Sequence, residues 1–457
     1  MKISRRNFIA GAAGLMAAAA FPNLAIGGKK MSANLVITNV HVLKPSGTVE
    51  VANIFITGDK ISAINNSTAN ADNCTFIDGR GKFAVPGFIN AHTHASMTLL
   101  RSLADDKALM DWLNQDIWPI EAKMNRYDIR AGAELAAVEM IKSGTTTFMD
   151  MYGPNMEEVA RVVEKSGMRG VLCRGLIGIF DGDEKLATNV ELFKNWNGKA
   201  GGRIKVMFGP HAVYTCPPDY LKKIAETAGG LGAEIHMHMN ETLDEINGCV
   251  KDYGKRPFEV VAETGLLDLG FLAAHCVHLS DGEIKIMRDK KVRVAHNPGS
   301  NMKLASGIAP VPKLLREGIT VGLGTDGASS NNNLDMLEEI RLAALLNKVN
   351  SLNPLEIPAF EATKMATEYG AAAVGIEKIG RLEAGYKADI VLFDMSGAEW
   401  QPTINPLSLM VYSANSASVD TVIVDGKILM QGRELKTLDE EKIIADFNAR
   451  VKKLLAK

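Results

Sequence analysis

Four residues of the chain could together hold a metal ion, and each stands where an apolar run ends. His92 and His94 lie in FINAHTHASM, His238 lies in AEIHMHMNET, and Asp326 lies in TVGLGTDGASS. Three imidazoles and one carboxylate form a ligand set that suits Zn²⁺ or Fe²⁺. The sequence therefore predicts a centre for one divalent metal ion.

Two further groups that can move protons close comparable apolar runs. Glu241 follows the run that contains His238, and His275 ends the run GFLAAH. Metal ligands and proton carriers at the ends of successive buried strands are typical of enzymes that activate water. The pattern predicts a metallohydrolase.

The spacing of the histidines supports some assignments and leaves others open. His92 and His94 are two residues apart on a predicted strand, so both face the same side and can bind one ion. His236 has the same relation to His238, and spacing alone allows either of them to be a ligand. Asp326 could bind metal and accept a proton, or it could instead cap the helix that follows.

The elements that must position these residues alternate between strand-like and helix-like segments from Pro86 to about Gly327. The helix-like segments include Tyr127 to Lys142, which has apolar residues near helical spacing. Eight apolar runs alternate with them: PGFINAHTH, GTTTFMDMY, RGVLCRGLIG, RIKVMFGPHAVYT, AEIHMHMN, GFLAAHCVHL, VRVAHNP and TVGLGTDG. Buried parallel strands alternating with helices predict an α/β fold with a (β/α)₈ TIM-like barrel at 86–385, and such barrels place their chemistry at the carboxyl ends of the strands.

The flanks of this region have a different pattern. Residues 33–85 and 386–435 alternate apolar and polar positions and contain turn residues such as Gly58-Asp59. We predict that the two flanks meet in one composite β-sandwich domain. The remaining residues, 436–457, are predicted to form a closing amphipathic helix.

The N-terminal segment, residues 1–30, reads as an export signal. It contains SRRNFI followed by an Ala-rich apolar stretch that is too short to cross a membrane. The arginine pair resembles the twin-arginine signal, whose export machinery would deliver a folded protein to the periplasm. Cleavage is expected between about Ala20 and Lys30. The alternatives are an uncleaved anchor, a random basic tail, or a start at Met31 that gives a cytosolic form.

The overall charge gives no indication of a polyanionic partner. Among 457 residues, 51 Lys and Arg balance 53 Asp and Glu, for a formal net charge of −2. This balance gives no electrostatic reason to expect binding to nucleic acid or to an anionic membrane. A small-molecule substrate is expected instead, and a homo-oligomer is compatible with the sequence.

The ordered motifs resemble those of the amidohydrolase superfamily. The superfamily pattern is matched by His-x-His on the first strand, His on the fifth and sixth, and Asp on the eighth. Within it, HASMTLLRSLADDKALMDWLNQDIWPIEAKM, VAHNPGSNMKLASGIAPV and LGTDGASSNNNLDMLEEIRLAALL resemble the deaminases of S-adenosylhomocysteine and 5′-methylthioadenosine. The resemblance covers about residues 33–435.

The resemblance implies a role for each residue of the centre. His238 is the expected third histidine ligand, and His236 a supporting residue. Glu241 would protonate the ring nitrogen of the substrate, His275 would orient the attacking water, and Asp326 would accept its proton. Relatives with two metals carry a modified lysine at the end of strand four, where KVMFGPHAVYT has none. One metal is therefore expected, most simply Zn²⁺, with Fe²⁺ as the alternative.

The resemblance also implies a substrate pocket. Trp112 would line it, Glu121 would accept hydrogen bonds from ribose hydroxyls, and His211 would contact the nucleoside. The first two also fit the packing face of a helix.

Two other residues bear on substrate choice. Ser330 could contact substrate or cap a helix. Arg174 matches an arginine that binds the carboxylate of homocysteine-containing substrates. Its expected second arginine is missing, since the nearest downstream cation is Lys185 in FDGDEKLATN.

Three functions remain open at this level. The first is hydrolytic deamination of adenosine-type nucleosides: 5′-methylthioadenosine, S-adenosylhomocysteine, 5′-deoxyadenosine or adenosine. The second is hydrolysis of another heterocycle, such as guanine, cytosine, a pterin or a chlorotriazine. The third is an exported protein that binds nucleosides without turnover, which has no need of Glu241, His275 and Asp326 together.

Overall fold

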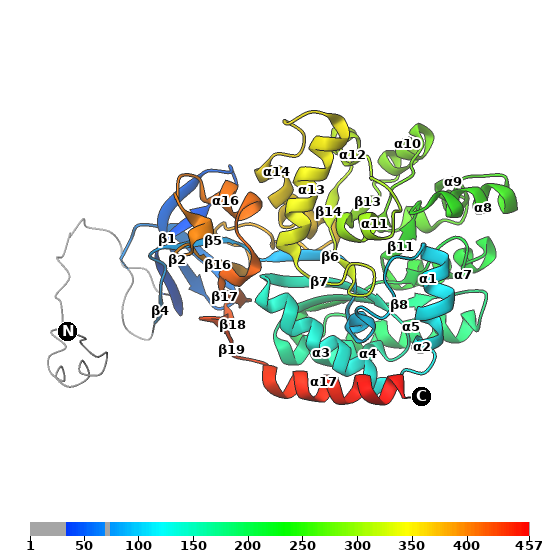
Figure 1. Cartoon of the computed structure of the whole chain (residues 1–457), viewed down its shortest axis with the longest axis horizontal. Helices are drawn as coiled ribbons and strands as arrows, with labels where there is room; N and C mark the ends of the chain where they lie inside the picture. The colour runs from blue at the N-terminus through cyan, green and yellow to red at the C-terminus, as the bar shows by residue number, and fades with distance from the viewer. Residues whose placement is uncertain (1–32, 69–73, 457) are drawn as a thin grey trace, which may run out of the picture.

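The computed structural model describes residues 33–68 and 74–456, so the predicted export signal lies outside the described residues. A large barrel and a smaller β domain lie side by side (Figure 1). Among the helices of the described ranges, none has both the length and the apolar content that a membrane span requires.

Parallel strands form the predicted barrel. They are β6 (Phe88–His94), β7 (Thr145–Tyr152), β8 (Arg169–Leu176), β9 (Ile204–Val206), β10 (Gly209–Pro210), β11 (Ile235–Met239), β12 (Phe271–His275), β13 (Arg293–His296), β14 (Val321–Leu323) and β15 (Asp326–Gly327). β9 and β10 share the fourth position, and β14 and β15 share the eighth. A bridge between Phe208 and Ile235 joins β11 to the fourth strand, and β15 pairs with β6 to close the ring. The expected (β/α)₈ barrel is confirmed.

Helices cover the outside of the barrel (Figure 1). They are α3 (Arg126–Lys142), α4 (Met156–Ser166), α5 (Gly182–Trp196), α6 (Lys199–Gly202), α7 (Pro218–Leu231), α8 (Leu243–Tyr253), α9 (Pro257–Ala262), α10 (Asp281–Asp289), α12 (Val311–Arg316), α13 (Met336–Ser351) and α14 (Ala359–Met365). Two short helices lie elsewhere: α11 (Pro298–Lys303) reaches Asp326 and His275, and α15 (Glu368–Ala373) packs on apolar residues inside the barrel. α3 coincides with the predicted helix and begins at a capping box, in which the Asn125 side chain accepts from Tyr127 N and Asp128 accepts from Asn125 N.

A long connection with short helices leads from β6 to α3, starting at the carboxyl end of β6. It consists of η1 (Ala95–Leu100), α1 (Leu109–Trp112), the short π-helix η2 (Leu113–Ile117) and α2 (Trp118–Glu121). π-Helical turns are rare and are frequent at functional sites. This connection carries Trp112 and Glu121, two of the residues predicted to bind substrate.

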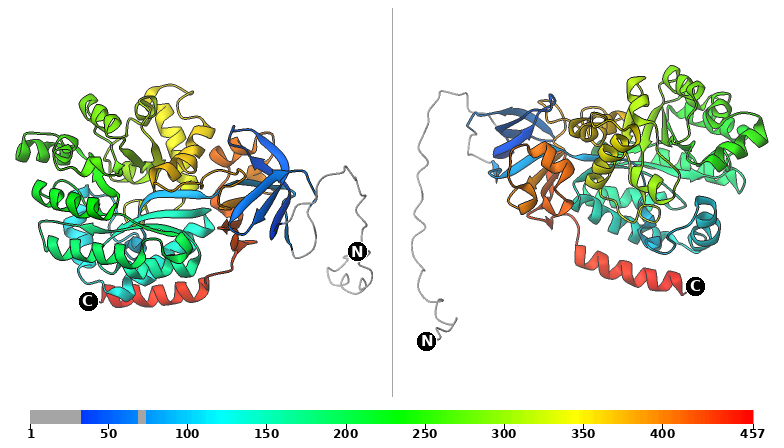
Figure 2. Two further views of the ribbon diagram at one scale, coloured as in Figure 1. Left: turned by 180° about the vertical axis from the view of Figure 1, so that it is seen from behind. Right: turned by 45° about the horizontal axis from the view of Figure 1, so that its top comes forward.

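The two flanks meet in one small β domain, as predicted. Its nine strands belong to a single hydrogen-bonded sheet: β1 (Leu35–Leu43), β2 (Val49–Thr57), β3 (Lys60–Asn65), β4 (Thr75–Asp78), β5 (Lys82–Pro86), β16 (Ile390–Asp394), β17 (Val419–Val424), β18 (Lys427–Gln431) and β19 (Glu434–Leu435). β5 and β16 pair antiparallel, and Figure 2 shows the blue N-terminal and orange C-terminal strands side by side. The predicted turn at Gly58-Asp59 joins β2 to β3.

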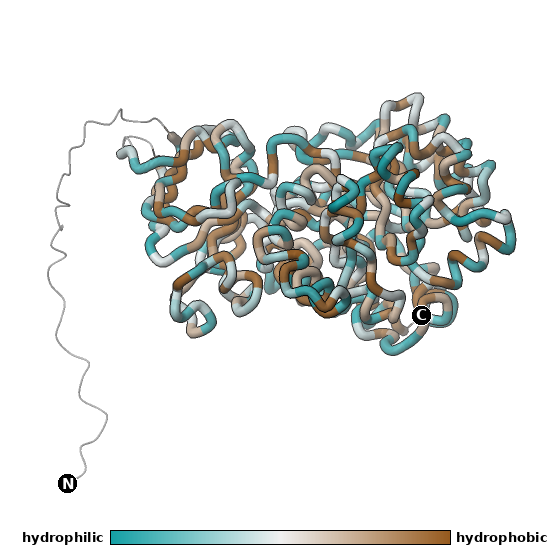
Figure 3. Tube along the Cα trace, turned by 90° about the horizontal axis from the view of Figure 1, so that it is seen from above, coloured by the Kyte–Doolittle hydropathy of each residue, from teal (hydrophilic) through white to brown (hydrophobic). Residues whose placement is uncertain are grey.

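The remaining C-terminal helices pack on these two parts. α16 (Pro406–Tyr412) lies beside α13 and α14, and α17 (Glu440–Leu455) lies along α3, where Lys142 Nζ contacts Glu440 Oε1 at 2.7 Å. Hydrophobic segments run through both the barrel and the β domain in Figure 3. All five cysteines are free thiols, and four of them are buried.

Buried charges connect the barrel to the β domain. Arg169, at the start of β8, is 3 % exposed, and its Nη2 lies 3.1 Å from Asp389 Oδ2 and 2.7 Å from Asp425 Oδ1. Asp389 precedes β16, and Asp425 follows β17. One guanidinium therefore compensates two carboxylates at the junction of the two parts.

Replacement of Arg169 by Met should destabilise the protein strongly, because the buried Asp389 would lose its cation and Asp425 would keep only Lys387, at 3.6 Å. We expect the free energy of unfolding, from denaturant titration, to fall by about 3–5 kcal/mol. Arg80→Met is the matched control, since the Arg80–Asp78 pair is exposed and should contribute less than about 1 kcal/mol. Equal small losses in both variants would contradict the role assigned to Arg169.

Candidate metal centre and active site

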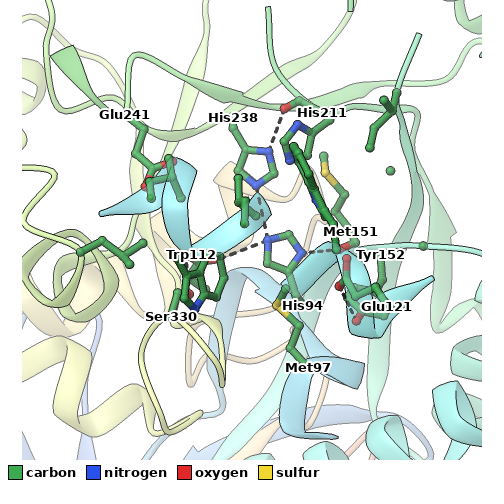
Figure 4. A pocket seen from close by; sticks show the side chains of 18 of the residues that line it. His94, Met97, Trp112, Glu121, Met151, Tyr152, His211, His238, Glu241 and Ser330 are labelled. Carbon is green, nitrogen blue, oxygen red and sulfur yellow. Dashed lines mark hydrogen bonds and ion pairs between the residues drawn. The ribbon is translucent and has the colours of Figure 1, made fainter. Parts of the chain in front are cut away.

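The histidines of β6 present their Nε2 atoms to one point because their Nδ1 atoms are bound elsewhere. His236 Nδ1 lies 3.1 Å from Leu272 O and donates to it, which leaves His236 Nε2 as an acceptor. His92 Nδ1 is 2.8 Å from His236 Nε2 and donates to it. His94 Nδ1 donates to Met151 O (Figure 4). His92 and His94 therefore both expose an Nε2 lone pair.

His238 on β11 completes the set in the same way. Its Nδ1 donates to the carbonyl oxygen of His211 at 2.8 Å, and its Nε2 lies 3.4 Å from His94 Nε2 (Figure 4). Both ring nitrogens of His236, by contrast, are used in hydrogen bonds. The geometry thus favours His238 as the ligand and His236 as the residue that orients His92.

Asp326 faces the histidines from β15. Its Oδ1 lies 3.2 Å from the Nε2 atoms of both His92 and His94. Its Oδ2 accepts hydrogen bonds from Ser300 Oγ at 2.6 Å and Ser330 Oγ at 2.9 Å. The alternative of a helix cap does not apply to Asp326 or Ser330, because α13 begins ten residues after Asp326 and is capped by Asp335.

The electrostatics of these residues favour positive charge between them. Burial opposes ionisation of Asp326, yet the rings of His92 and His94 hold its pKa well below the usual range. Burial opposes protonation of His94, yet Asp326 raises its pKa to about 9. Burial lowers the pKa of His92 to about 4. Imidazole lone pairs that face a buried carboxylate need a cation between them.

A metal ion fits this arrangement. The potential ligand atoms of His92, His94 and His238 lie within 4.8 Å of one another, as do those of His92, His275 and Asp326. Lys205, on strand four, contacts Glu234 Oε2 at 2.7 Å and the carbonyl oxygens of Val374 and Gly375. It is therefore committed elsewhere, and one metal remains the expectation.

The proton carriers lie beside this centre. His275 Nε2 is 3.7 Å from Glu241 Oε2, and Ser306 Oγ donates to Glu241 Oε1 at 3.2 Å. Burial raises the pKa of Glu241 above its usual value. His275 and Asp326 have positive φ angles of 71° and 62°, a conformation that is uncommon outside glycine and recurs at functional sites.

The centre opens into a cavity of about 130 Å³. Trp112, Glu121, His211 and Ser330 line it, as the sequence predicted. In Figure 4, Trp112, Ser330 and Glu241 lie on one side of His94 and His238, and His211 and Glu121 lie on the other. Burial lowers the pKa of His211 to about 3, so its ring is neutral at pH 7.

Two tyrosines of the cavity were missed by the sequence reasoning. Tyr152 OH donates to Glu121 Oε1 at 2.6 Å, and Tyr214 packs edge-on against His211. A signal for both was present, since Tyr152 ends the second strand and Tyr214 follows the fourth. Chain position at the carboxyl end of the barrel could have identified them.

Arg174 is the one predicted substrate residue that the structure does not bring to the cavity. On β8, Cys173 packs inside the barrel, so Arg174 points to the opposite face of the strand. Its backbone N–H is bound to Asn189 of α5 at 2.7 Å, and the cavity is lined instead by Gly175 and Ile177. A contact between Arg174 and substrate stays a prediction.

Comparisons with known proteins identify the family of the chain and agree with its fold. The family model described as the amidohydrolase family matches residues 83–429, and the chain belongs to this family. A 5-methylthioadenosine/S-adenosylhomocysteine deaminase from Pelotomaculum thermopropionicum is 50 % identical over 430 residues, which cover 93 % of this chain and 99 % of the relative.

Two solved structures share the fold of this chain. An adenosine deaminase from Xanthomonas campestris with bound zinc has a TM-score of 0.88 and 32 % identity over 94 % of this chain and all of that one. A zinc complex of the atrazine chlorohydrolase from Arthrobacter aurescens has a TM-score of 0.85 and 25 % identity over 91 % of this chain and all of that one.

Alanine substitutions should separate ligand from supporting histidine. We expect the purified protein to hold about one equivalent of divalent metal, by elemental analysis, and His238→Ala to lose it. His236→Ala should retain metal with an affinity about 10–100-fold lower in chelator competition, because it removes only the partner of His92. His41→Ala, in the β domain, is the control. Full metal content in His238→Ala would refute its role as a ligand.

Proposed function

We propose that the chain is a metal-dependent hydrolytic deaminase of adenosine-type nucleosides, which yields the inosine analogue and ammonia. The observation that carries this proposal is the convergence of three Nε2 lone pairs and Asp326 Oδ1 beside the buried carboxyl group of Glu241, within a cavity lined by Trp112. The deaminase name of the relative that is 50 % identical supports the reaction type. The zinc in the related structures supports Zn²⁺ as the ion.

His92, His94, His238 and Asp326 would hold the metal. A divalent ion at this position supplies a nucleophile by lowering the pKa of a water molecule toward neutrality. The adenine ring enters with its exocyclic amine toward the centre. Glu241 then donates its proton to the adjacent ring nitrogen, which makes the carbon that bears the amine electrophilic.

Asp326 and His275 complete the proton movements. His275 accepts a hydrogen bond from the attacking water and orients it toward the ring. Asp326 accepts a proton from that water and delivers it to the amine, which leaves as ammonia. The proton of the new hydroxyl group passes to Glu241 as the carbonyl of the inosine analogue forms. Ser300 and Ser330 donate to Oδ2 of Asp326, and Oδ1 faces His92 and His94, so the carboxylate is held in place for this transfer.

The cavity wall favours a ribosyl group with a small 5′ substituent. The Glu121 carboxylate, held by Tyr152, has one oxygen left to accept from ribose hydroxyls. A homocysteine carboxylate would need a cation, and Arg174 is directed away from the cavity. We therefore expect 5′-methylthioadenosine, 5′-deoxyadenosine and adenosine to be better substrates than S-adenosylhomocysteine.

Ammonia release by the zinc-loaded protein tests the proposal. The panel contains the four adenosine derivatives named above together with guanine, cytosine and a chlorotriazine. We expect turnover of the adenosines and a fall in kcat of about 10²–10⁴-fold in Glu241→Gln, because the amide cannot donate the carboxyl proton.

The control for folding is the metal content, which Glu241→Gln should leave unchanged since Glu241 is not a ligand. Turnover of free bases or chlorotriazine alone would reassign the enzyme to another heterocycle. Nucleoside binding without ammonia release would favour the non-catalytic binding protein.

We also propose that residues 1–30 direct export through the twin-arginine machinery to the periplasm. The arginine pair and the apolar stretch that follows it support this proposal. Replacement of Arg5 and Arg6 by Lys should retain the protein in the cytoplasm, as measured by immunoblotting of cell fractions. Equal periplasmic amounts in the parent and the variant would refute twin-arginine export.

A further inference from the structure

Asn301 of α11 lies against the ring of His275 on the side away from the metal centre. Its Oδ1 is 2.8 Å from His275 Nδ1, and both residues are almost completely buried. None of the roles assigned above uses Asn301. It is nevertheless the nearest side-chain partner of a ring that must meet the attacking water.

This contact determines which nitrogen of His275 carries the proton. A carbonyl oxygen only accepts hydrogen bonds, so Nδ1 must be the donor. Asn297 Nδ2 lies farther from the same nitrogen, at 3.4 Å, and is itself a donor. The shorter contact to an acceptor favours the tautomer with hydrogen on Nδ1.

The opposite nitrogen of His275 then faces the reaction. His275 Nε2 lies 3.7 Å from Glu241 Oε2. A ring nitrogen of His275 also lies within 4.8 Å of the potential ligand atoms of His92 and Asp326. With Nδ1 protonated, Nε2 carries the lone pair that accepts a hydrogen bond from water. A proton on Nε2 would instead oppose both the ion and the attacking water.

His94 and His238 also donate a hydrogen bond from Nδ1, but to different kinds of acceptor. Backbone carbonyl oxygens hold the Nδ1 atoms of His94 and His238. These carbonyls are fixed by the strands and cannot be removed by mutation. His275 depends on a side chain, which makes its tautomer accessible to a test.

The position of Asn301 is itself determined by a buried carboxylate. Glu339 of α13 accepts from Gly299 N at 3.0 Å and from Asn331 Nδ2 at 2.7 Å, which ties the segment after β13 to the segment after β15. The same segment after β13 supplies Ser300 to Asp326 and Ser306 to Glu241. One short segment thus contacts all three proton carriers.

We propose that Asn301 is a positioning residue that holds His275 in the Nδ1-protonated tautomer, so that Nε2 can accept a hydrogen bond from the attacking water. The inference rests on the proposed function for its effect on turnover. Its structural content, the site of the proton on His275, is independent of the substrate.

Two variants and one control test the proposal in the zinc-loaded protein. Asn301→Leu keeps the size of the side chain and removes the acceptor, whereas Asn301→Asp keeps an oxygen at the same place. Asn347→Leu is the matched control, since Asn347 is also buried but bonds to Ala343 O within α13. Long-range ¹H–¹⁵N spectra report the protonation of each ring nitrogen, and His275 is assigned by the signals that His275→Asn loses.

We expect His275 to be protonated on Nδ1 in the parent and in Asn301→Asp, and to lose this preference in Asn301→Leu. The kcat of Asn301→Leu should fall about 10–100-fold with little change in KM, because orientation of the water, not substrate binding, is affected. Asn301→Asp should recover most of this loss, and Asn347→Leu should leave kcat and the His275 signals unchanged.

Three results would overturn the proposal. The first is protonation of His275 on Nε2 in the parent protein, a result that does not depend on the folding of any variant. The second is an unchanged tautomer in Asn301→Leu, and the third is an equal loss of kcat in Asn301→Leu and Asn347→Leu. A parent protein that releases no ammonia from any nucleoside would refute the proposed function, while the spectra would still decide the tautomer.

Discussion

Three imidazole nitrogens and one carboxylate oxygen face one another in a buried space at the carboxyl end of the barrel, and this convergence depends on a cation. Asp326 Oδ1 lies 3.2 Å from the Nε2 atoms of His92 and His94. Without positive charge these groups would repel or would have to take up protons. Much of the surrounding structure serves to hold them in place.

The hydrogen bonds behind the centre show how this is done. Each histidine gives its Nδ1–H to a fixed acceptor, which leaves Nε2 directed at the ion. Ser300 and Ser330 fix the second oxygen of Asp326. The barrel supplies these three acceptors from β7, from β11 and from the segment after β10, so the centre is rigid only when the barrel is closed.

The β domain contributes to the same rigidity from the opposite end of the barrel strands. β5 of the sheet leads within two residues to β6, which carries His92 and His94. Arg169 joins β8 to the loops around β16 and β17 through the carboxylates of Asp389 and Asp425. The strand that bears the first two ligands is thereby anchored at its start, far from the chemistry.

Periodicity and motif order in the sequence determined the barrel, the flanking β domain and α3, because strand and helix patterns are local properties of the chain. They also identified His92, His94, Glu241, His275 and Asp326 as chemical groups. The choice between His238 and His236 was decided by contacts with His211 O and Leu272 O, which come from other strands. The outward direction of Arg174, the cavity tyrosines and the contact of Asn301 with His275 likewise arise only when distant segments meet. Residue type and spacing specify what a side chain can do, whereas its partners, and hence its orientation and proton position, are set by tertiary packing.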